Sequence, residues 1–356
     1  MDASPIYRLP EDTLYQIFWN LPVGQIIICR CVCKFFNRIL TSPSFIHLIS
    51  TQPPPRLLAL RPPRHHDHLH VFDPDRHQWL GFPLNFLPFR CPQPVASSLG
   101  LVYLWADSPD SSLSLVACNP LTRQYRELPQ LSSAWSRHDS VLVGSPNRVL
   151  VLTKLATLYY SGSNICLKFS SNLPSKPRSP ILVSDSVIVL CNVGTRWRSQ
   201  WKLFTCTLTS LQSSHAWTRL EKHEWGDVFD ILKRPRLLKG IGNRILMIGG
   251  LTSSFSLNGL CSTILILRLD LDTLEWDEAA RMPAEMFSCF QESSKFKVFG
   301  GGNRVCFSAK RVRSLALWEY SEEAGKGEWR WIDGVPGNWD GLCRGFVFEA
   351  RLSALP

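Results

Sequence analysis

The sequence predicts an α+β multidomain chain, in which a small N-terminal helical unit is followed by an all-β propeller of about six blades. Three observations predict this fold. Apolar residues near the N-terminus recur at helical spacing, short apolar runs bounded by turn residues fill the rest of the chain, and aromatic residues mark these runs about every 50 residues. The expected segments are a helical unit over 1–50, a proline-rich linker over 51–64 and the propeller over 65–356.

The helical unit is predicted from two apolar faces. One comprises Leu14, Ile17, Phe18 and Leu21, and the other comprises Ile28, Val32, Phe35 and Ile39. Both sets follow helical spacing, and Pro22 ends the first helix because a proline disfavours helical geometry in the residue before it. About 40 residues form too small a core to stand alone. The unit therefore needs a partner, either the rest of this chain or another protein.

The early apolar run is not expected to be a signal peptide or a membrane anchor, because Asp2 precedes it and Glu11 and Asp12 interrupt it. No later stretch offers the roughly 20 mostly apolar residues of a spanning helix. The twelve cysteines include no CxxC pair, which favours reduced thiols. We therefore expect a protein of the nucleus, the cytoplasm or both, without membrane contact.

The stretch LPEDTLYQIFWNLPVGQIIICRCVCKFFNRIL resembles an F-box, and the resemblance covers residues 5 to about 48. Two Leu-Pro pairs and a Val-Cys-Lys triplet occur in that family's order, although Phe36 stands where Trp is usual. The resemblance implies binding to a Skp-type adaptor and, through it, to a cullin. It assigns the adaptor contacts to Leu9, Pro10, Leu14, Ile17, Leu21, Pro22, Val32 and Phe36. The alternative is an ordinary hairpin of core helices.

The linker TQPPPRLLALRPPR holds five prolines, which favour an extended and fairly stiff connection. Its LLAL run is alternatively an edge strand of the following domain. Beyond it, runs such as GLVYLW, VIVLC and ILILRLDLD have the length of strands, and no helical stripe is found after residue 50. The long domain is therefore expected to be nearly all β.

A repeated phrase runs through this domain: an apolar strand, a polar turn and an aromatic residue. The aromatic markers are Trp79, Tyr125, Trp217, Trp276 and Trp331. Their gaps are 46, 92, 59 and 55 residues, and the gap of 92 predicts one degenerate unit around NICLKFSSNLP. The mean step of about 50 residues is the period of kelch repeats, and glycine doublets at 249–250 and 300–301 support it. A β-sandwich is the alternative. The C-terminal GFVFEARL is expected to close the ring with the first blade.

The phrase CNPLTRQYRELP resembles the kelch-type and F-box-associated domains of plant F-box proteins, and the partial resemblance covers about 290 residues. It implies a non-catalytic substrate receptor of an SCF-type ubiquitin ligase, which holds a target protein on the propeller and promotes its ubiquitination and proteasomal degradation. Trp197 and Trp201 are speculative contacts for that target, with a place in the blade core as the alternative.

Motifs of enzyme chemistry are not found: the chain has no G-x-S-x-G, Walker-type or H-E-x-x-H sequence. HHDHLH would place His66, His68 and His70 on one face of a strand, but a solvated loop is the simpler interpretation. A copper-containing kelch-ring oxidase would need clustered Tyr, His and Cys ligands, which the spacing does not indicate. We therefore expect no metal and no cofactor.

The net charge of +10 is spread along the chain rather than concentrated, so nucleic-acid binding is not expected. KRPR at 233–236 is a candidate nuclear-import signal or simply a turn around Pro235. Two other functions are left open. The chain could be a scaffold outside ubiquitination, or a regulator whose basic propeller binds nucleic acid.

Overall fold

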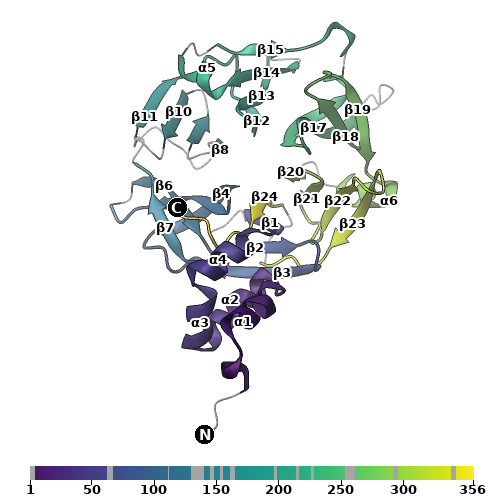
Figure 1. Cartoon of the computed structure of the whole chain (residues 1–356). Helices are drawn as coiled ribbons and strands as arrows, with labels where there is room; N and C mark the ends of the chain where they lie inside the picture. Colours follow the sequence, from purple (N-terminus) through teal and green to yellow (C-terminus); the bar gives the residue numbers. More distant parts are fainter. Residues whose placement is uncertain are drawn as a thin grey trace.

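The computed structural model describes residues 5–356 except 62–66, 111, 130–139, 145–147, 153–154, 161–164, 196–198, 214–215, 226–227, 253–260, 292–295 and 338–341. The chain forms a ring of β-sheets with a small helical unit attached to the outside of the ring (Figure 1). This arrangement confirms the expected fold class, helices first and an all-β propeller after them.

The helical unit contains four α-helices instead of the expected two. After the short η1 (Pro5–Arg8) come α1 (Glu11–Trp19), α2 (Val23–Val32), α3 (Lys34–Leu40) and α4 (Pro43–Ser50). The second apolar face was predicted as one helix, but Cys33 is extended (φ −159°, ψ 163°) and separates α2 from α3. Its Sγ accepts a hydrogen bond from the Phe36 N–H at 3.4 Å, which caps α3. Pro10 and Pro22 occupy the N-cap positions of α1 and α2.

The described residues of the ring form six four-stranded antiparallel sheets, which we call blades 1 to 6. Blade 1 comprises β24 (Arg344–Glu349), β1 (Arg56–Arg61), β2 (His68–Asp73) and β3 (Gln78–Pro83). Blades 2 and 3 comprise β4 (Arg90–Ser98), β5 (Leu101–Asp107), β6 (Leu113–Asn119), β7 (Gln124–Glu127), β8 (Ser140–Gly144), β9 (Arg148–Leu152), β10 (Leu155–Tyr160) and β11 (Ile165–Ser170). Blades 4 to 6 comprise β12 (Arg178–Val183), β13 (Ser186–Asn192), β14 (Trp201–Thr207), β15 (Thr218–Leu220), β16 (Leu232–Lys239), β17 (Arg244–Thr252), β18 (Cys261–Asp270), β19 (Trp276–Arg281), β20 (Phe296–Gly301), β21 (Arg304–Ala309), β22 (Leu315–Ser321) and β23 (Lys326–Ile332).

The strands β24, β4, β8, β12, β16 and β20 are the inner strands, because each contacts the corresponding strand of the neighbouring blades around the ring (Figure 1). The last strand of the chain closes this ring. β24 pairs with β1 in a register that runs from Arg56–Glu349 to Arg61–Arg344, which confirms the expected closure by the C-terminal segment.

The LLAL run corrects the expected linker. It belongs to β1, which lies between β24 and β2 and is therefore neither a linker nor an edge strand. Leu57, Leu58, Ala59 and Leu60 are all buried. A strand that is paired on both sides and covered on both faces has an uninterrupted apolar sequence. The proline-rich connection is thus confined to the residues before Arg56.

The aromatic markers lie on or directly before the outermost strands. Trp79, Tyr125 and Trp276 pair with Phe72, Cys118 and Leu269 at the same position of the last hairpin of their blades. In blade 6 the expected marker, Trp331, does not lie at this position. The residue at the equivalent position of the hairpin is Gly327, which pairs with Tyr320. A side chain at Gly327 would overlap the indole of Trp318, so another aromatic ring occupies that space.

Two further expectations are corrected. The glycine doublets are not equivalent, because Gly249-Gly250 lies in the second strand of blade 5 and Gly300-Gly301 ends the first strand of blade 6. The ring also holds two short helices that the sequence did not predict, α5 (Leu208–Ser213) and α6 (Ala284–Gln291). Met286, Phe287 and Phe290 of α6 are buried.

Candidate protein-docking site

The helical unit exposes apolar side chains on its outer side. The exposed fraction is 37% for Leu9, 43% for Ile17, 58% for Ile28 and 64% for Val32. Ile28 and Val32 are four residues apart on α2, so they share one face of that helix. Large apolar groups on a surface are costly to hydrate, and a protein partner is the usual way to cover them. We call Leu9, Ile17, Ile28 and Val32 the docking residues.

The opposite side of the same helices is a core. Leu14 and Phe18 of α1 are buried, and the ring of Phe18 meets Phe36 edge-to-face at 5.1 Å. Leu14 therefore packs inside the helical unit in this structure, and its predicted adaptor contact stays a prediction. It lies inside because α1 is only nine residues long and its apolar residues divide between two sides.

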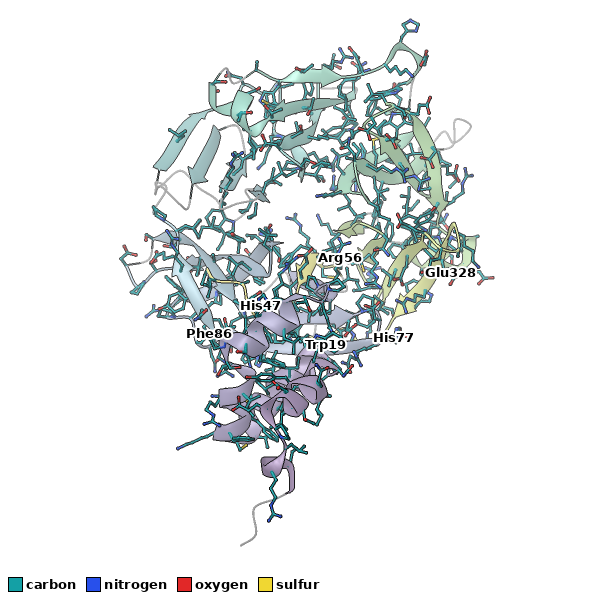
Figure 2. All side chains as sticks on the ribbon, viewed as in Figure 1. Trp19, His47, Arg56, His77, Phe86 and Glu328 are labelled. Atoms are coloured by element: carbon teal, nitrogen blue, oxygen red, sulfur yellow. The ribbon has the colours of Figure 1, made fainter. Side chains whose placement is uncertain are left out.

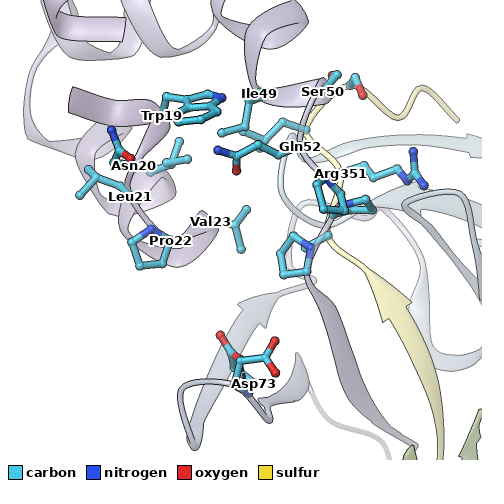
Figure 3. A pocket seen from close by; sticks show the side chains of 18 of the residues that line it. Trp19, Asn20, Leu21, Pro22, Val23, Ile49, Ser50, Gln52, Asp73 and Arg351 are labelled. Carbon is cyan, nitrogen blue, oxygen red and sulfur yellow. Dashed lines mark hydrogen bonds between the residues drawn. The ribbon is translucent and has the colours of Figure 1, made fainter. Parts of the chain in front are cut away.

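The other predicted contact residues take three positions. Pro10 is exposed beside Leu9, and Phe36 is half-buried against Phe18. Leu21 and Pro22 line a crevice of about 400 Å³ between the helices and the ring. In Figure 3, Trp19, Val23 and Ile49 face this crevice from the helical unit, with Asp73 and Arg351 on the ring side. The structure thus exposes Leu9, Pro10, Ile17 and Val32, leaves Leu21, Pro22 and Phe36 partly exposed, and buries Leu14.

A continuous core fixes the helices to the ring. It joins side chains from the helices, from blades 1 and 2 and from the C-terminal tail, including Leu14, Phe18, Ile26, Ile39, Leu40, Phe45, Leu57, Val71, Val102, Leu104, Leu352 and, half-buried, Phe86. Figure 2 shows side chains filling this junction around the labelled Trp19. The docking residues are therefore held at the rim of a rigid body rather than on a flexible tether.

The C-terminal tail locks this junction. Asn119 Nδ2 donates hydrogen bonds of 2.9 Å to the carbonyl oxygens of both Arg351 and Ala354. The Ala350 N–H donates to the Pro55 carbonyl at 3.0 Å. Because Pro55 directly precedes β1, the end of the chain binds the segment that connects the helices to the ring.

Of the two tryptophans predicted as target contacts, the structure describes Trp201. Trp197 lies outside the described residues. Trp201 begins β14 and packs half-buried against the core of blades 4 and 5. The guanidinium carbon of Arg178 lies 4.8 Å from the centre of its ring. This cation–π pair lies where β12, the inner strand of blade 4, begins.

Two histidines of the HHDHLH segment lie on β2. His68 and His70 of β2 have ring centroids 6.1 Å apart, whereas His66 is outside the described residues. Within the described ranges, no three His, Cys, Asp or Glu side chains gather in a way that could hold a metal ion. Among those residues, no helix combines the length and apolar content that crossing a membrane would require.

A helical docking unit attached to the rim of a six-bladed ring defines the class of F-box proteins with a propeller. The F-box domain model matches residues 6–48, and the Kelch motif model matches residues 237–283, which span most of blade 5. The chain is 63% identical to SKP1-interacting partner 15 of Arabidopsis thaliana over the full length of both proteins.

Two more distant relatives match almost the whole of this chain. An F-box/kelch-repeat protein of Arabidopsis thaliana is 25% identical over 99% of this chain and 89% of its own length. The protein UNUSUAL FLORAL ORGANS of the same species is 22% identical over 99% of this chain and 87% of its own length. The chain belongs to the F-box/kelch-repeat family of plant proteins.

Proposed function

We propose that this protein is a non-catalytic substrate receptor of an SCF-type ubiquitin ligase. In this function the F-box binds a Skp-type adaptor, which joins it to a cullin, and the propeller holds a target protein for ubiquitination and degradation. The observation that carries the proposal is the row of exposed apolar docking residues on the helices of a matched F-box. The name of the full-length relative, SKP1-interacting partner 15, supports the same partner.

The geometry explains how such a receptor would work without bond-making residues. The helices are fixed to blades 1 and 2 through a continuous core, so the adaptor and the target would be held at one defined separation. Reaction rates rise when a reactant is held near its partner at high effective concentration. The receptor's contribution is therefore to position the target's lysines, while the chemistry belongs to other subunits.

The double variant Ile28→Asp Val32→Asp tests the docking face. It places two carboxylates on an apolar surface of α2 and should reduce adaptor capture in a pull-down at least tenfold, because burying an unpaired charge is costly. Both side chains are exposed, so thermal unfolding should stay within about 2 °C of wild type.

A matched control is Val193→Asp Ile231→Asp, which changes two exposed apolar residues of the ring. It should leave adaptor capture unchanged. Full adaptor binding by the Ile28→Asp Val32→Asp protein would contradict the docking role. Purified complexes that hold the adaptor but no cullin would instead favour a scaffold outside ubiquitination. Residence in the nucleus, the cytoplasm or both stays a prediction, to be checked by imaging the tagged protein.

A further inference from the structure

Three inner strands have the same short pattern within their first four residues: a basic residue, one further residue and a proline. The three segments are Arg90-Cys91-Pro92 in β4, Arg178-Ser179-Pro180 in β12 and Lys233-Arg234-Pro235 in β16. In each blade the pairing with the second strand shifts register at this point, between residues 90 and 93, 178 and 181, and 233 and 236. The pattern is therefore a β-bulge that recurs at the same place in blades 2, 4 and 5.

The bulges hold an unusual backbone. The middle residues Cys91, Ser179 and Arg234 have φ values of 49°, 46° and 55°, in the region that favours glycine. Such conformations are costly, and bulges commonly redirect side chains near functional sites. In blade 5, Gly249 of β17 faces the bulge, with the carbonyl oxygen of Lys233 3.1 Å from where its Cβ would lie. The glycine doublet thus makes room for this bulge.

The three bulges lie at one end of the ring. Inner strands of successive blades run in the same direction, as their C-terminal ends show: Gly302, just after β20, donates its N–H to the carbonyl of Lys239 at the end of β16 (2.8 Å). The N-terminal ends of the inner strands therefore meet at the opposite end. We call this end the basic mouth, and it comprises Arg61, Arg90, Arg178, Lys233, Arg234, Lys297 and Arg344.

The charged side chains of the inner strands are nearly all basic. Their described residues include eight basic side chains, Arg90, Arg178, Lys233, Arg234, Arg236, Lys239, Lys297 and Arg344. The same strands carry one acidic residue, Glu349, which lies at the other end of β24 and binds Arg351 at 2.9 Å. On the neighbouring strand β5, Asp107 is the cross-strand partner of Arg90. A rim on which basic side chains predominate attracts ligands of negative charge.

The cations at the basic mouth are also crowded. Arg61 and Arg344 are direct cross-strand partners in the pairing of β1 with β24. Like charges in that position destabilise a sheet. Burial, and then the charge of Arg344, lower the pKa of Arg61 to about 10. Burial, and then the charge of Arg234, lower the pKa of Arg178. An anion bound between such groups would relieve this repulsion.

Arginines at the other end of the ring bind carboxylates of the same chain. There, Arg148 binds Asp185 at 2.8 Å, Arg244 binds Asp270 at 3.2 Å and Arg304 binds Glu319 at 2.6 Å. Arginines at that end therefore have carboxylate partners within the chain. Asp75, which contacts Arg304, lines the crevice beside the helices, so the F-box junction adjoins this neutralised end.

We propose that the basic mouth binds an extended acidic segment of the target protein, rich in Asp and Glu. The guanidinium groups of several blades are suited to a peptide with many carboxylates rather than to one small anion, because each guanidinium can bind a separate carboxylate. The Arg178–Trp201 stack would hold one guanidinium in place for this contact. The inference rests on the proposed function, since it names the class of target that the receptor would take.

The test uses the full chain and fluorescence anisotropy with a labelled peptide of twelve residues, mostly Glu. Wild type should bind it with an affinity that falls steeply with salt, and a Lys-rich peptide of equal length should not bind. The variant Arg178→Ala Arg234→Ala should weaken binding at least tenfold. The control Arg281→Ala Lys326→Ala removes two basic residues from the outer strands β19 and β23, and its affinity should stay within twofold of wild type.

If the affinity for the Glu-rich peptide fell equally in the Arg178→Ala Arg234→Ala variant and in the control, the effect would be one of net charge only. That result would overturn the proposal. So would an affinity for single-stranded DNA that equals or exceeds the affinity for the Glu-rich peptide. Adaptor capture is measured on the same proteins and should be unchanged. If the peptide fails to bind while the adaptor still does, the acidic target is refuted and the receptor function stands.

Discussion

At the scale of single residues, burial decides which side chains can take part in binding and which react. Leu14 and Ile17 are three residues apart in α1, yet Leu14 is buried and Ile17 is exposed. The cysteines divide in the same way among the described residues: Cys31, Cys91 and Cys289 are exposed, whereas Cys118, Cys191, Cys206, Cys306 and Cys343 are buried. Burial disfavours the charged thiolate and raises the pKa of Cys118 to about 12.

This shift predicts how stability depends on pH. Below pH 9, Cys118 is protonated in both the folded and the unfolded chain. Between pH 9 and 12 the unfolded chain releases this proton while the folded chain retains it, so stability falls as pH rises. The slope from one such thiol is about 1.4 kcal/mol per pH unit.

Urea unfolding of wild type and Cys118→Ala between pH 8.5 and 10.5 measures this contribution. The variant is less stable throughout because it loses buried volume, but its stability should fall less steeply with pH. Parallel pH curves for the two proteins would show that the thiol of Cys118 does not carry the effect. Comparison of the two slopes removes the contribution of other groups that titrate in this range.

At the scale of elements, one turn design recurs and explains the phrase that predicted the blades. The Oδ1 atom of Asp73 accepts the N–H of Asp75 at 3.1 Å, and the Oδ1 atom of Asp270 accepts the N–H of Asp272 at 2.9 Å. Asn119 does the same with Leu121 in blade 2. Four residues after each of these positions lies a residue with positive φ, and the marker aromatic follows two residues later. The phrase therefore encodes the last hairpin of a blade.

The same scale shows why other elements were not predictable. The helices α3 and α4 have seven and eight residues, too few for a periodicity to separate them from α2. The sequence pattern points to Trp331 in blade 6 because Gly327, the residue with the equivalent register, has no aromatic side chain. The basic mouth was missed because its residues are far apart in sequence, although the shared basic-X-Pro pattern was there to be found.

Gly250 provides a test at this scale. A Cβ there would overlap the Sγ atom of Cys261 on the paired strand β18, so Gly250→Ala should destabilise the protein by about 1–3 kcal/mol in chemical unfolding. Gly24→Ala is the control, because the nearest side-chain atom, on Leu80, lies 3.6 Å from its Cβ and alanine favours the helix. A Gly250→Ala protein as stable as wild type would contradict the account of the close approach.

At the scale of the whole molecule, the sequence predicted the ring and its closure but not the attachment of the helices. The repeat length and the final apolar strand were sufficient for the ring. The attachment depends on a core shared by residues as distant in the chain as Leu14, Val102 and Leu352, which no local pattern reveals. It also depends on Asn119, whose amide binds the tail.

Removal of the tail tests this attachment. A chain that ends at Glu349 keeps β24 but loses the buried Leu352 and three hydrogen bonds, two donated by Asn119 and one donated by Ala350 to the carbonyl of Pro55. It should lose roughly 5 kcal/mol of stability, from about 1 kcal/mol for each of the three hydrogen bonds and about 2 kcal/mol for the leucine. Limited proteolysis should then cleave the helical unit first. A chain that ends at Ala354 loses only the exposed Leu355 and the partly exposed Pro356, and it should behave as wild type.

The completion of blade 1 by β24 has a consequence for synthesis of the protein. Until β24 leaves the ribosome, β1 has an unpaired backbone edge, and such edges invite pairing with other chains. A nascent polypeptide that stops before β24 keeps this open edge, and it also lacks the tail that holds the F-box in place. Only a molecule in which β24 has joined blade 1 can offer both its adaptor and its target a finished surface.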